Sequence, residues 1–344
     1  MVPKIGSFSP LLVFLLLLVV LLPLASSGCS SDEHLVDSRI DGAVDEILIA
    51  PDAASDESVA GIDGAPAPAA DAASKLDAYV QSALVAARPY TVHVPSSYTG
   101  SPTPLVVMLH GYASSAANHE AYFQLAPLSD SKGFLYAYPD GTKDIIFQQF
   151  WNATDACCDI FKKNIDDVAY VHAVLDDLQA RFVVDPKRIF LIGHSNGGFL
   201  SHRMACDAAD RIAAIVSLEG DNWKDLGHCH PAEPVAILQI HGDADGTINY
   251  KGGSFPNLQP YPSAHDSVMG WVGLNGCLTT PDTSHAAVDI SADLAGAETT
   301  VEKWNGCRGG AVELWTVHSG VHEPKLATLA TDLMWNFLST HPKP

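Results

Sequence analysis

The sequence predicts an α/β protein with a mostly parallel central sheet and helices on both faces. Short apolar runs of strand length recur from about residue 76 onward, and stretches with helical spacing lie between several of them. Strands that alternate with helices form parallel sheets, because each crossover helix returns the chain to the same edge. Apolar residues make up 47% of the chain, which is enough for a sizeable core.

Seven strands are expected where β-branched, aromatic and other apolar residues form runs of strand length. They cover residues 90–94, 105–109, 134–138, 189–192, 213–218, 235–240 and 312–317. A helix is predicted by apolar residues at three- and four-residue steps, namely Val168, Val171, Leu175, Leu178 and Phe182. Asp166 and Asp167 favour its N-terminus, and Asp185-Pro186 is expected to end it and lead into the next strand. The last helix is expected over residues 326–338.

The first 28 residues have the features of an export signal. Lys4 gives a positive start, residues 11–24 form an apolar run, and small residues lead to Cys29. The run is shorter than the roughly 20 apolar residues of a membrane-spanning helix. A cysteine after small residues resembles a bacterial lipoprotein signal, whose cysteine is lipidated, although Ser26 stands where that motif usually has leucine. Ordinary cleavage nearby is the alternative, and both predict an extracellular or surface-anchored protein.

Residues 29–75 are predicted to be a disordered linker, and residues 76–344 a folded domain. Between residues 30 and 75 the chain has eleven acidic residues, two basic residues and no Phe, Trp or Tyr. Such a segment cannot bury enough apolar surface to fold. The whole chain has a net charge of −21, from 40 acidic and 19 basic residues. Nucleic acid is therefore excluded as a partner, because phosphate binding needs a basic surface.

Seven cysteines also indicate a compartment outside the cytoplasm, where disulfides persist. With Cys29 set aside, six remain, which allow 15 connectivities. Cys277 with Cys307 is the preferred pair, because each follows an Asn-Gly turn and the two flank one insertion. The other candidates are Cys157, Cys158, Cys206 and Cys229, with Cys229 expected to pair with Cys206 or with the 157–158 pair. Histidines flank Cys229, but zinc needs more ligands, so no metal is predicted.

A serine between two glycines lies where a predicted strand meets a helix. The segment Gly193-His194-Ser195-Asn196-Gly197 follows the apolar run at 189–192. A tight turn here lifts a hydroxyl clear of the sheet edge, and the glycines avoid collisions with neighbouring elements. Serine is a weak nucleophile until an adjacent base takes its proton. Ser195 is therefore the candidate nucleophile.

The partners of such a serine follow it along the chain, first an acid and then a histidine. Asp245, after the strand at 235–240, is the preferred acid, with Asp243 as the alternative. His322 is the preferred base, because it follows a Ser-Gly turn beyond the last strand and is free to reach Ser195. His318 ends that strand and is expected to pack instead.

The turn His110-Gly111-Tyr112 follows the strand at 105–109. We expect the backbone N–H groups of Tyr112 and Asn196 to form the oxyanion hole that holds the developing negative oxygen. His110 is expected to shape the turn through a hydrogen bond. The candidate walls of the substrate pocket are Tyr112, Trp151, Tyr250 and Trp271, with packing in the core as the alternative for each.

Six segments, in unbroken order, resemble the secreted esterases grouped with polyhydroxybutyrate depolymerases and type-one feruloyl esterases. They are PLVVMLHGY, GFLYAYPDG, FWNATDACC, IDDVAYV, RIFLIGHSNGGFLSHRMAC and ILQIHGDADGTINYKGG, and the resemblance covers roughly residues 80–340. It implies an α/β-hydrolase fold for the domain at 76–344, a serine esterase mechanism, and no metal or organic cofactor. By position it assigns the nucleophile to Ser195, the acid to Asp245 and the base to His322.

The resemblance implies a secreted or surface-anchored carboxylic ester hydrolase that works through an acyl-enzyme, on feruloyl or acetyl esters of plant polysaccharide. Three alternatives remain open: a depolymerase of polyhydroxybutyrate oligomers, a serine peptidase on the same fold, and a non-catalytic surface-binding lipoprotein. The chain departs from the family at Val321-His322-Glu323-Pro324, where the family usually has Gly-His-x-Trp-Pro. The missing tryptophan bears on substrate choice.

Overall fold

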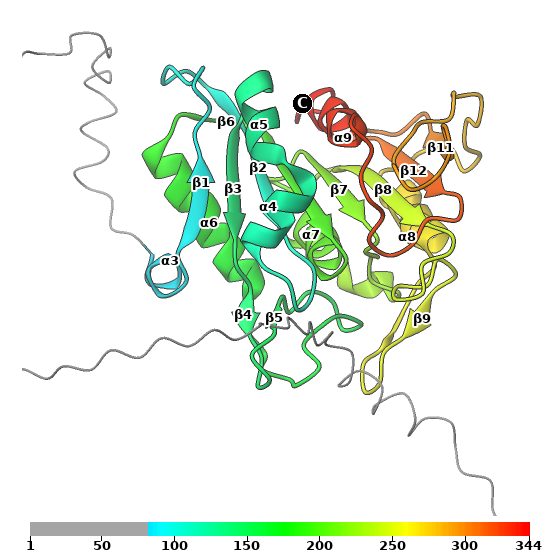
Figure 1. Ribbon diagram of the computed structural model, residues 1–344, viewed down its shortest axis with the longest axis horizontal. Coiled ribbons are helices and arrows are strands. Elements are labelled where there is room, and N and C mark those ends of the chain that lie inside the picture. The colour runs from blue at the N-terminus through cyan, green and yellow to red at the C-terminus, as the bar shows by residue number, and fades with distance from the viewer. Residues whose placement is uncertain (1–81) are drawn as a thin grey trace, which may run out of the picture. The chain divides into compact units, whose positions relative to one another are not determined.

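The computed structural model describes residues 82–344 (Figure 1). The predicted export signal at 1–28, Cys29, the linker at 29–75 and the first residues of the predicted domain lie outside the described residues. Within residues 82–344, no helix combines the length and the apolar character that crossing a membrane requires.

An eight-stranded sheet forms the centre of the described part, in the strand order β1-β3-β2-β6-β7-β8-β12-β11. The six inner strands are parallel to their neighbours, and the two edge strands, β1 and β11, pair antiparallel. This confirms the predicted mostly parallel sheet. The strands are β1 (Tyr90–His93), β2 (Thr103–Leu109), β3 (Leu135–Pro139), β6 (Val184–His194), β7 (Ala214–Leu218), β8 (Ala236–Gly242), β11 (Thr299–Trp304) and β12 (Val312–Val317).

Helices cover both faces of this sheet (Figure 1). Alternate residues of β2 enter opposite cores, with Leu105, Val107 and Leu109 in one and Val106 and Met108 in the other. Burial on both faces explains why parallel strands of this kind are continuous apolar runs. One core contains α3 (Ala83–Ala87), α6 (Asp167–Arg181), α7 (Asn196–Asp207) and α8 (Ala264–Leu274). The other contains α4 (Ala116–Phe123), α5 (Leu125–Lys132) and α9 (Ala330–Ser339).

Short elements complete the described part. Two ribbons of two strands each pair β4 (Thr142–Lys143) with β5 (Gln149–Phe150), and β9 (Gly253–Ser254) with β10 (Pro260–Tyr261). A 3₁₀ turn, η2, covers Leu226–His228.

All seven predicted strands are present, and the differences lie at their ends and at one edge. Helix α6 already ends at Arg181, and Asp185-Pro186 lies inside β6. A proline is tolerated there because the register of β2 against β6 shifts between Thr103 and Leu105. Strand β11 was not predicted, because Glu302 and Lys303 interrupt its apolar pattern, as is common at an exposed sheet edge. Helix α9 begins at Ala330, four residues later than expected.

Three disulfides join the six cysteines of the described residues, namely Cys277–Cys307, Cys206–Cys229 and Cys157–Cys158. The preferred pair is therefore present, and its two Asn-Gly turns have positive φ at the glycines, +63° at Gly276 and +70° at Gly306. Cys229 is bonded to Cys206, so its sulfur is not free to bind a metal. Three disulfides fit a protein that folds in an oxidising compartment.

Candidate active site

Ser195 occupies a strained turn between β6 and α7. Its backbone has φ +53° and ψ −119°, a conformation that non-glycine residues rarely adopt and that clusters at functional sites. A Cβ added to Gly193 would lie 2.1 Å from the Gly197 oxygen, and one added to Gly197 would lie 2.0 Å from the Leu109 oxygen. The two glycines are therefore required by the close approach of backbone to backbone, as the motif predicted.

We expect Gly197→Ala to destabilise the domain by more than about 4 kcal/mol, because the backbone of β2 cannot move aside. Gly273→Ala is the matched control, since Gly273 is exposed on α8 and a Cβ there meets nothing within 4 Å. Thermal unfolding followed by circular dichroism should show a soluble control with an unchanged or slightly raised Tm. Equal Tm values for the two variants would contradict the packing assigned to this turn.

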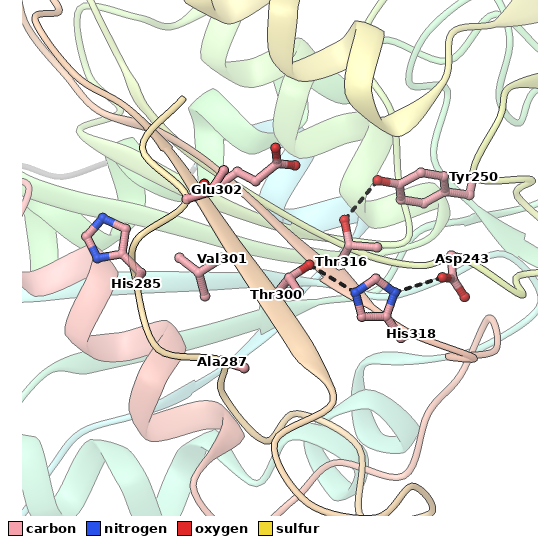
Figure 2. Close-up of a pocket in the computed structure, with 10 residues that line it drawn as sticks. Asp243, Tyr250, His285, Ala287, Thr300, Val301, Glu302, Thr316 and His318 are labelled. Atoms are coloured by element: carbon pink, nitrogen blue, oxygen red, sulfur yellow. Dashed lines mark hydrogen bonds and ion pairs between the residues drawn. The ribbon is translucent and has the colours of Figure 1, made fainter. Parts of the chain in front are cut away.

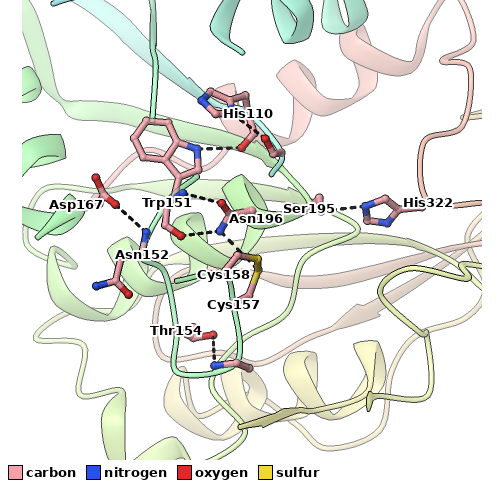
Figure 3. The surroundings of a disulfide bond; sticks show 12 residues. His110, Trp151, Asn152, Thr154, Cys157, Cys158, Asp167, Ser195, Asn196 and His322 are labelled. Carbon is pink, nitrogen blue, oxygen red and sulfur yellow. Dashed lines mark hydrogen bonds between the residues drawn. A yellow bond between two sulfur atoms is a disulfide. The ribbon is translucent and has the colours of Figure 1, made fainter. Parts of the chain in front are cut away.

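The structure brings together the three side chains predicted as nucleophile, base and acid. His322 Nε2 lies 2.9 Å from Ser195 Oγ, and His322 Nδ1 lies 2.7 Å from Asp245 Oδ2. Ser195 and His322 point toward one another in Figure 3. The three residues follow the carboxyl ends of β6, β12 and β8, which meet at one edge of a parallel sheet. A hydroxyl, a base and an orienting acid at these distances can activate the hydroxyl as a nucleophile.

Asp245 is buried and ionised. Its Oδ1 accepts the backbone N–H groups of Thr247 and Ile248 at 2.6 and 2.9 Å. Burial alone would raise the pKa of Asp245, but hydrogen bonds from His241, His322 and the backbone hold this pKa well below its usual range. The carboxylate can therefore stabilise a protonated His322.

The two alternatives, Asp243 and His318, pair with each other instead of joining the site. His318 Nδ1 lies 3.0 Å from Asp243 Oδ2, and His318 Nε2 lies 3.1 Å from Thr300 Oγ1, as Figure 2 shows. His318 was expected to pack, but its side chain is 50% exposed because β12 ends one residue earlier. This group lines a cavity of about 530 Å³ that does not contain Ser195. It offers a matched control for each residue of the Ser195 site.

Two buried histidines that the sequence did not single out support the backbone of His322. His194 Nε2 donates to the His322 carbonyl at 2.8 Å, and His194 Nδ1 lies 3.0 Å from His119 Nε2, which accepts the Gly111 N–H at 3.2 Å. His119 Nδ1 lies 2.9 Å from Ser114 Oγ. Burial lowers the pKa of His194 to about 3, which keeps the ring neutral. These hydrogen bonds fix the loop that carries His322.

The loop after β2, which is predicted to carry one oxyanion donor, lies against Ser195. A Cβ on Gly111 would lie 3.4 Å from the Ser195 Cβ. His110 Nε2 accepts the Gly141 N–H at 2.8 Å, and His110 Nδ1 donates to the Gly111 carbonyl at 2.8 Å. His110 therefore shapes this turn. The hydroxyl of Tyr112 donates to Asp144 at 2.6 Å, which fixes the end of the turn.

The segment around Cys157–Cys158 forms hydrogen bonds with Asn196 (Figure 3). Asn196 accepts the Trp151 N–H at 2.7 Å and donates to the Trp151 carbonyl at 2.9 Å. Asn196 Nδ2 also lies 3.6 Å from Cys157 Sγ. These contacts orient the first residue of α7, whose backbone N–H is the second predicted oxyanion donor.

A small apolar cavity of about 90 Å³ adjoins Ser195. Its walls come from four loops, and its other lining residues are Tyr112, Cys158, Ile160, Thr247, Ile248, Phe255 and Leu258. Of these, the sequence predicted Tyr112 both as a pocket wall and as an oxyanion donor, and Cys158 as a disulfide partner. The one further signal was position, because Thr247 and Ile248 lie two and three residues after Asp245.

Three of the four aromatic residues predicted as pocket walls, Trp151, Tyr250 and Trp271, lie elsewhere, which corrects the expectation for these three. Trp151 is fully buried and donates from Nε1 to the His110 carbonyl at 2.9 Å. Trp271 is fully buried on α8 and donates to His202 Nδ1 at 3.0 Å. Tyr250 contacts Thr316 and lines the cavity of Figure 2. Each ring has a partner that holds it away from the cavity at Ser195.

Comparison with known proteins confirms the resemblance that the motifs predicted. Residues 88–235 match the family described as Esterase PHB depolymerase. The chain is 29% identical to Feruloyl esterase B of Piromyces equi over 73% of its length, which covers 45% of that protein. It is 28% identical to Feruloyl esterase D of Neurospora crassa over 69% of its length, which covers 74% of that protein. The chain spans about half the length of several curated relatives that it matches.

The fold is that of the α/β-hydrolases. The acetyl xylan esterase from Aspergillus awamori superposes with a TM-score of 0.52 at 14% identity, over 72% of this chain and 92% of that one. At this identity the likeness concerns the fold alone.

Proposed function

We propose that this protein, whose residues 88–235 match the family described as Esterase PHB depolymerase, is a serine carboxylic ester hydrolase. The observation that carries the proposal is the meeting of Ser195, His322 and Asp245 at 2.9 and 2.7 Å. Ser195 attacks the ester carbonyl while His322 takes its proton and then passes it to the leaving alcohol. Asp245 stabilises the imidazolium, and water hydrolyses the acyl-enzyme.

The oxyanion of each tetrahedral intermediate is held by the backbone N–H groups of Tyr112 and Asn196. Support comes from the packing of the loop at 110–112 against Ser195 and from the place of Asn196 at the start of α7. Removing one donor of such a site typically costs about 10²–10³-fold in rate.

The acyl group of the substrate is an acetyl or feruloyl group on plant polysaccharide, and the cavity favours acetyl. An apolar cavity that binds a benzene ring measures about 150 Å³. The cavity beside Ser195 measures about 90 Å³, so it suits a short acyl chain better than an aromatic one. A 3-hydroxybutyryl ester is the second candidate, which the family match supports.

One panel with a shared leaving group tests both the activity and the acyl preference. We expect kcat/KM for 4-nitrophenyl acetate to exceed that for 4-nitrophenyl ferulate by about 10–200-fold, the range for misfit in an apolar pocket. A peptide 4-nitroanilide should be the poorest substrate. Faster turnover of the peptide would identify a peptidase, and no turnover of any ester would indicate a binding protein.

A variant with a larger cavity ties this preference to the pocket. Leu258→Ala should lower the ratio of kcat/KM for 4-nitrophenyl acetate to kcat/KM for 4-nitrophenyl ferulate, because Leu258 lines the cavity and a smaller side chain enlarges it. Leu278→Ala, at a leucine that is 63% exposed, should leave the ratio unchanged. An equal change of this ratio in the two variants would show that the cavity does not determine the acyl preference.

We also propose that the chain is exported through residues 1–28 and attached to a bacterial cell surface by lipidation of Cys29, with residues 29–75 as the tether to the catalytic domain at 76–344. The signal-like sequence before Cys29 and the three disulfides support this assignment.

A further inference from the structure

Glu219 is a buried carboxyl group that the proposed mechanism does not use. It follows β7 with φ +57° and is fully buried. Its two oxygens accept the Gly242 N–H at 2.9 and 3.1 Å, and Oε2 lies 3.2 Å from His241 Nε2. His241 Nε2 also lies 3.5 Å from Asp245 Oδ2, so the two carboxyl groups meet at this nitrogen, and a hydrogen bond between them contributes to the raised pKa of Glu219. Polar atoms of Glu219, His241 and Asp245 all lie within 4.8 Å of one another.

The hydrogen bonds around His241 indicate where the protons of this cluster lie. Gln239 Nε2 donates to the Gly220 carbonyl at 2.7 Å, which identifies it as the amide nitrogen, and it lies 3.2 Å from His241 Nδ1. Nδ1 therefore accepts a hydrogen bond from Gln239 and carries no proton. His241 Nε2 then carries the ring proton and donates to the Ile248 carbonyl at 2.8 Å.

Two touching carboxyl groups in a buried site do not both ionise. Asp245 takes the negative charge, because His322 and two backbone N–H groups donate to it. Burial and the charge of Asp245 raise the pKa of Glu219 well above its usual value, although His241 acts in the opposite direction. Burial lowers the pKa of His241, but the neighbouring carboxyls raise it by more, which makes this ring the competing site for the proton. The Gln239 N–H directed at Nδ1 disfavours a second proton on the ring.

The geometry points to Glu219 as a positioning residue that donates a hydrogen bond from its carboxyl group to Asp245 and so holds the carboxylate toward His322. The inference rests on the proposed function. A protonated carboxyl in an apolar site can act as such a donor. It orients Asp245 without adding a second negative charge, so one charge faces the His322 imidazolium as it forms.

Other titratable groups also face this cluster. They are His322 from the loop after β12, His194 at the end of β6, Tyr122 from α4, Asp221 from the loop after β7, Tyr250 from the loop before β9, and Tyr261 from β10. Tyr122 donates to the Pro324 carbonyl at 2.7 Å, and Asp221 accepts from Ser267 at 3.0 Å. Neither of these two hydrogen bonds involves Asp245.

Glu219→Gln and Glu219→Met separate the role of a donor from that of a charge. The glutamine amide can still donate to Asp245, so kcat should stay within about threefold of wild type, with the acidic limb of the pH–kcat profile unmoved. Methionine fills the volume without a donor, and kcat should fall about 10–100-fold with KM nearly unchanged, as for loss of a hydrogen bond to a charged group. Glu313→Gln, at a buried carboxyl that accepts from Trp315 and pairs with Lys303 away from this cluster, is the control and should keep the wild-type kcat and pH profile.

A second measurement separates failure of this inference from failure of the proposed function. The proton on His322 Nδ1, shared with Asp245, should give a downfield NMR signal that is kept in Glu219→Gln and moved upfield in Glu219→Met, whatever the substrate. A Glu219→Gln variant with lower kcat and an acidic limb at lower pH would show that Glu219 is ionised, and would overturn the inference. Wild-type kcat and an unmoved signal in Glu219→Met would overturn it as well.

Discussion

Ser195→Ala is expected to lower kcat for 4-nitrophenyl acetate by about 10⁶-fold, the loss seen when the nucleophile of a serine hydrolase is removed. The residual rate should remain above that of water, because the oxyanion donors and the pocket persist. Ser195 contributes one hydroxyl to a cavity wall, so the variant should fold with a Tm close to that of wild type.

Thr300→Ala is the matched control for this loss. The Thr300 hydroxyl lies 3.1 Å from His318, and His318 lies 3.0 Å from Asp243, so this group repeats the spacing of the Ser195 site nearby. It lacks the strained turn and the start of a helix that Ser195 has. Its removal should leave kcat unchanged within about twofold. A loss shared by both variants would show that the Ser195 site is not the sole catalytic centre.

Asp245→Asn should lower kcat by about 10⁴-fold with little change in KM. An amide in place of the carboxylate cannot stabilise the imidazolium, and its N–H directed at His322 Nδ1 favours the wrong tautomer of the base. The geometry should be kept, because asparagine has nearly the same shape as aspartate.

Asp243→Asn is the control for that variant, because Asp243 lies two residues away and contacts His318 instead of His322. Rates for 4-nitrophenyl acetate across pH 5–9 should show the wild-type profile for Asp243→Asn. If Asp243→Asn caused the larger loss, the acid of the site would be misassigned.

Much of this site could be predicted because its sequence signals are local and because the topology of a parallel sheet brings the three residues together. The run at 189–192 with its two glycines marked the turn at Ser195, and the acid and the histidine had to follow later strands. Since the carboxyl ends of parallel strands share one edge, side chains 77 and 127 residues apart along the chain meet there. The seven strands were recognisable for a related reason, because inner strands buried on both faces are continuously apolar.

The pocket walls could not be predicted in the same way. Phe255 and Leu258 lie between β9 and β10, and Ile160 follows the disulfide at 157–158, so their positions depend on loop packing that no periodicity records. Trp151 and Trp271 were expected in the pocket because they are aromatic, but each has an indole N–H that is satisfied inside the core.

Glu219 and His194 were missed for another reason. Their roles depend on partners that are distant in sequence, Asp245 for the first and the His322 carbonyl for the second. No sequence motif predicts either partner, and no sequence pattern distinguishes a buried glutamate at the end of a strand from an exposed one. Only the folded chain shows that the second carboxyl touches the first.

Mass spectrometry of the protein after reaction with a fluorophosphonate shows whether Ser195 is an activated nucleophile, because the reagent bonds to an activated serine hydroxyl and needs no knowledge of the substrate. We expect one adduct per chain, on the peptide that contains Ser195, and none in Ser195→Ala. An adduct that persists in that variant, or one carried by Thr300, would contradict it.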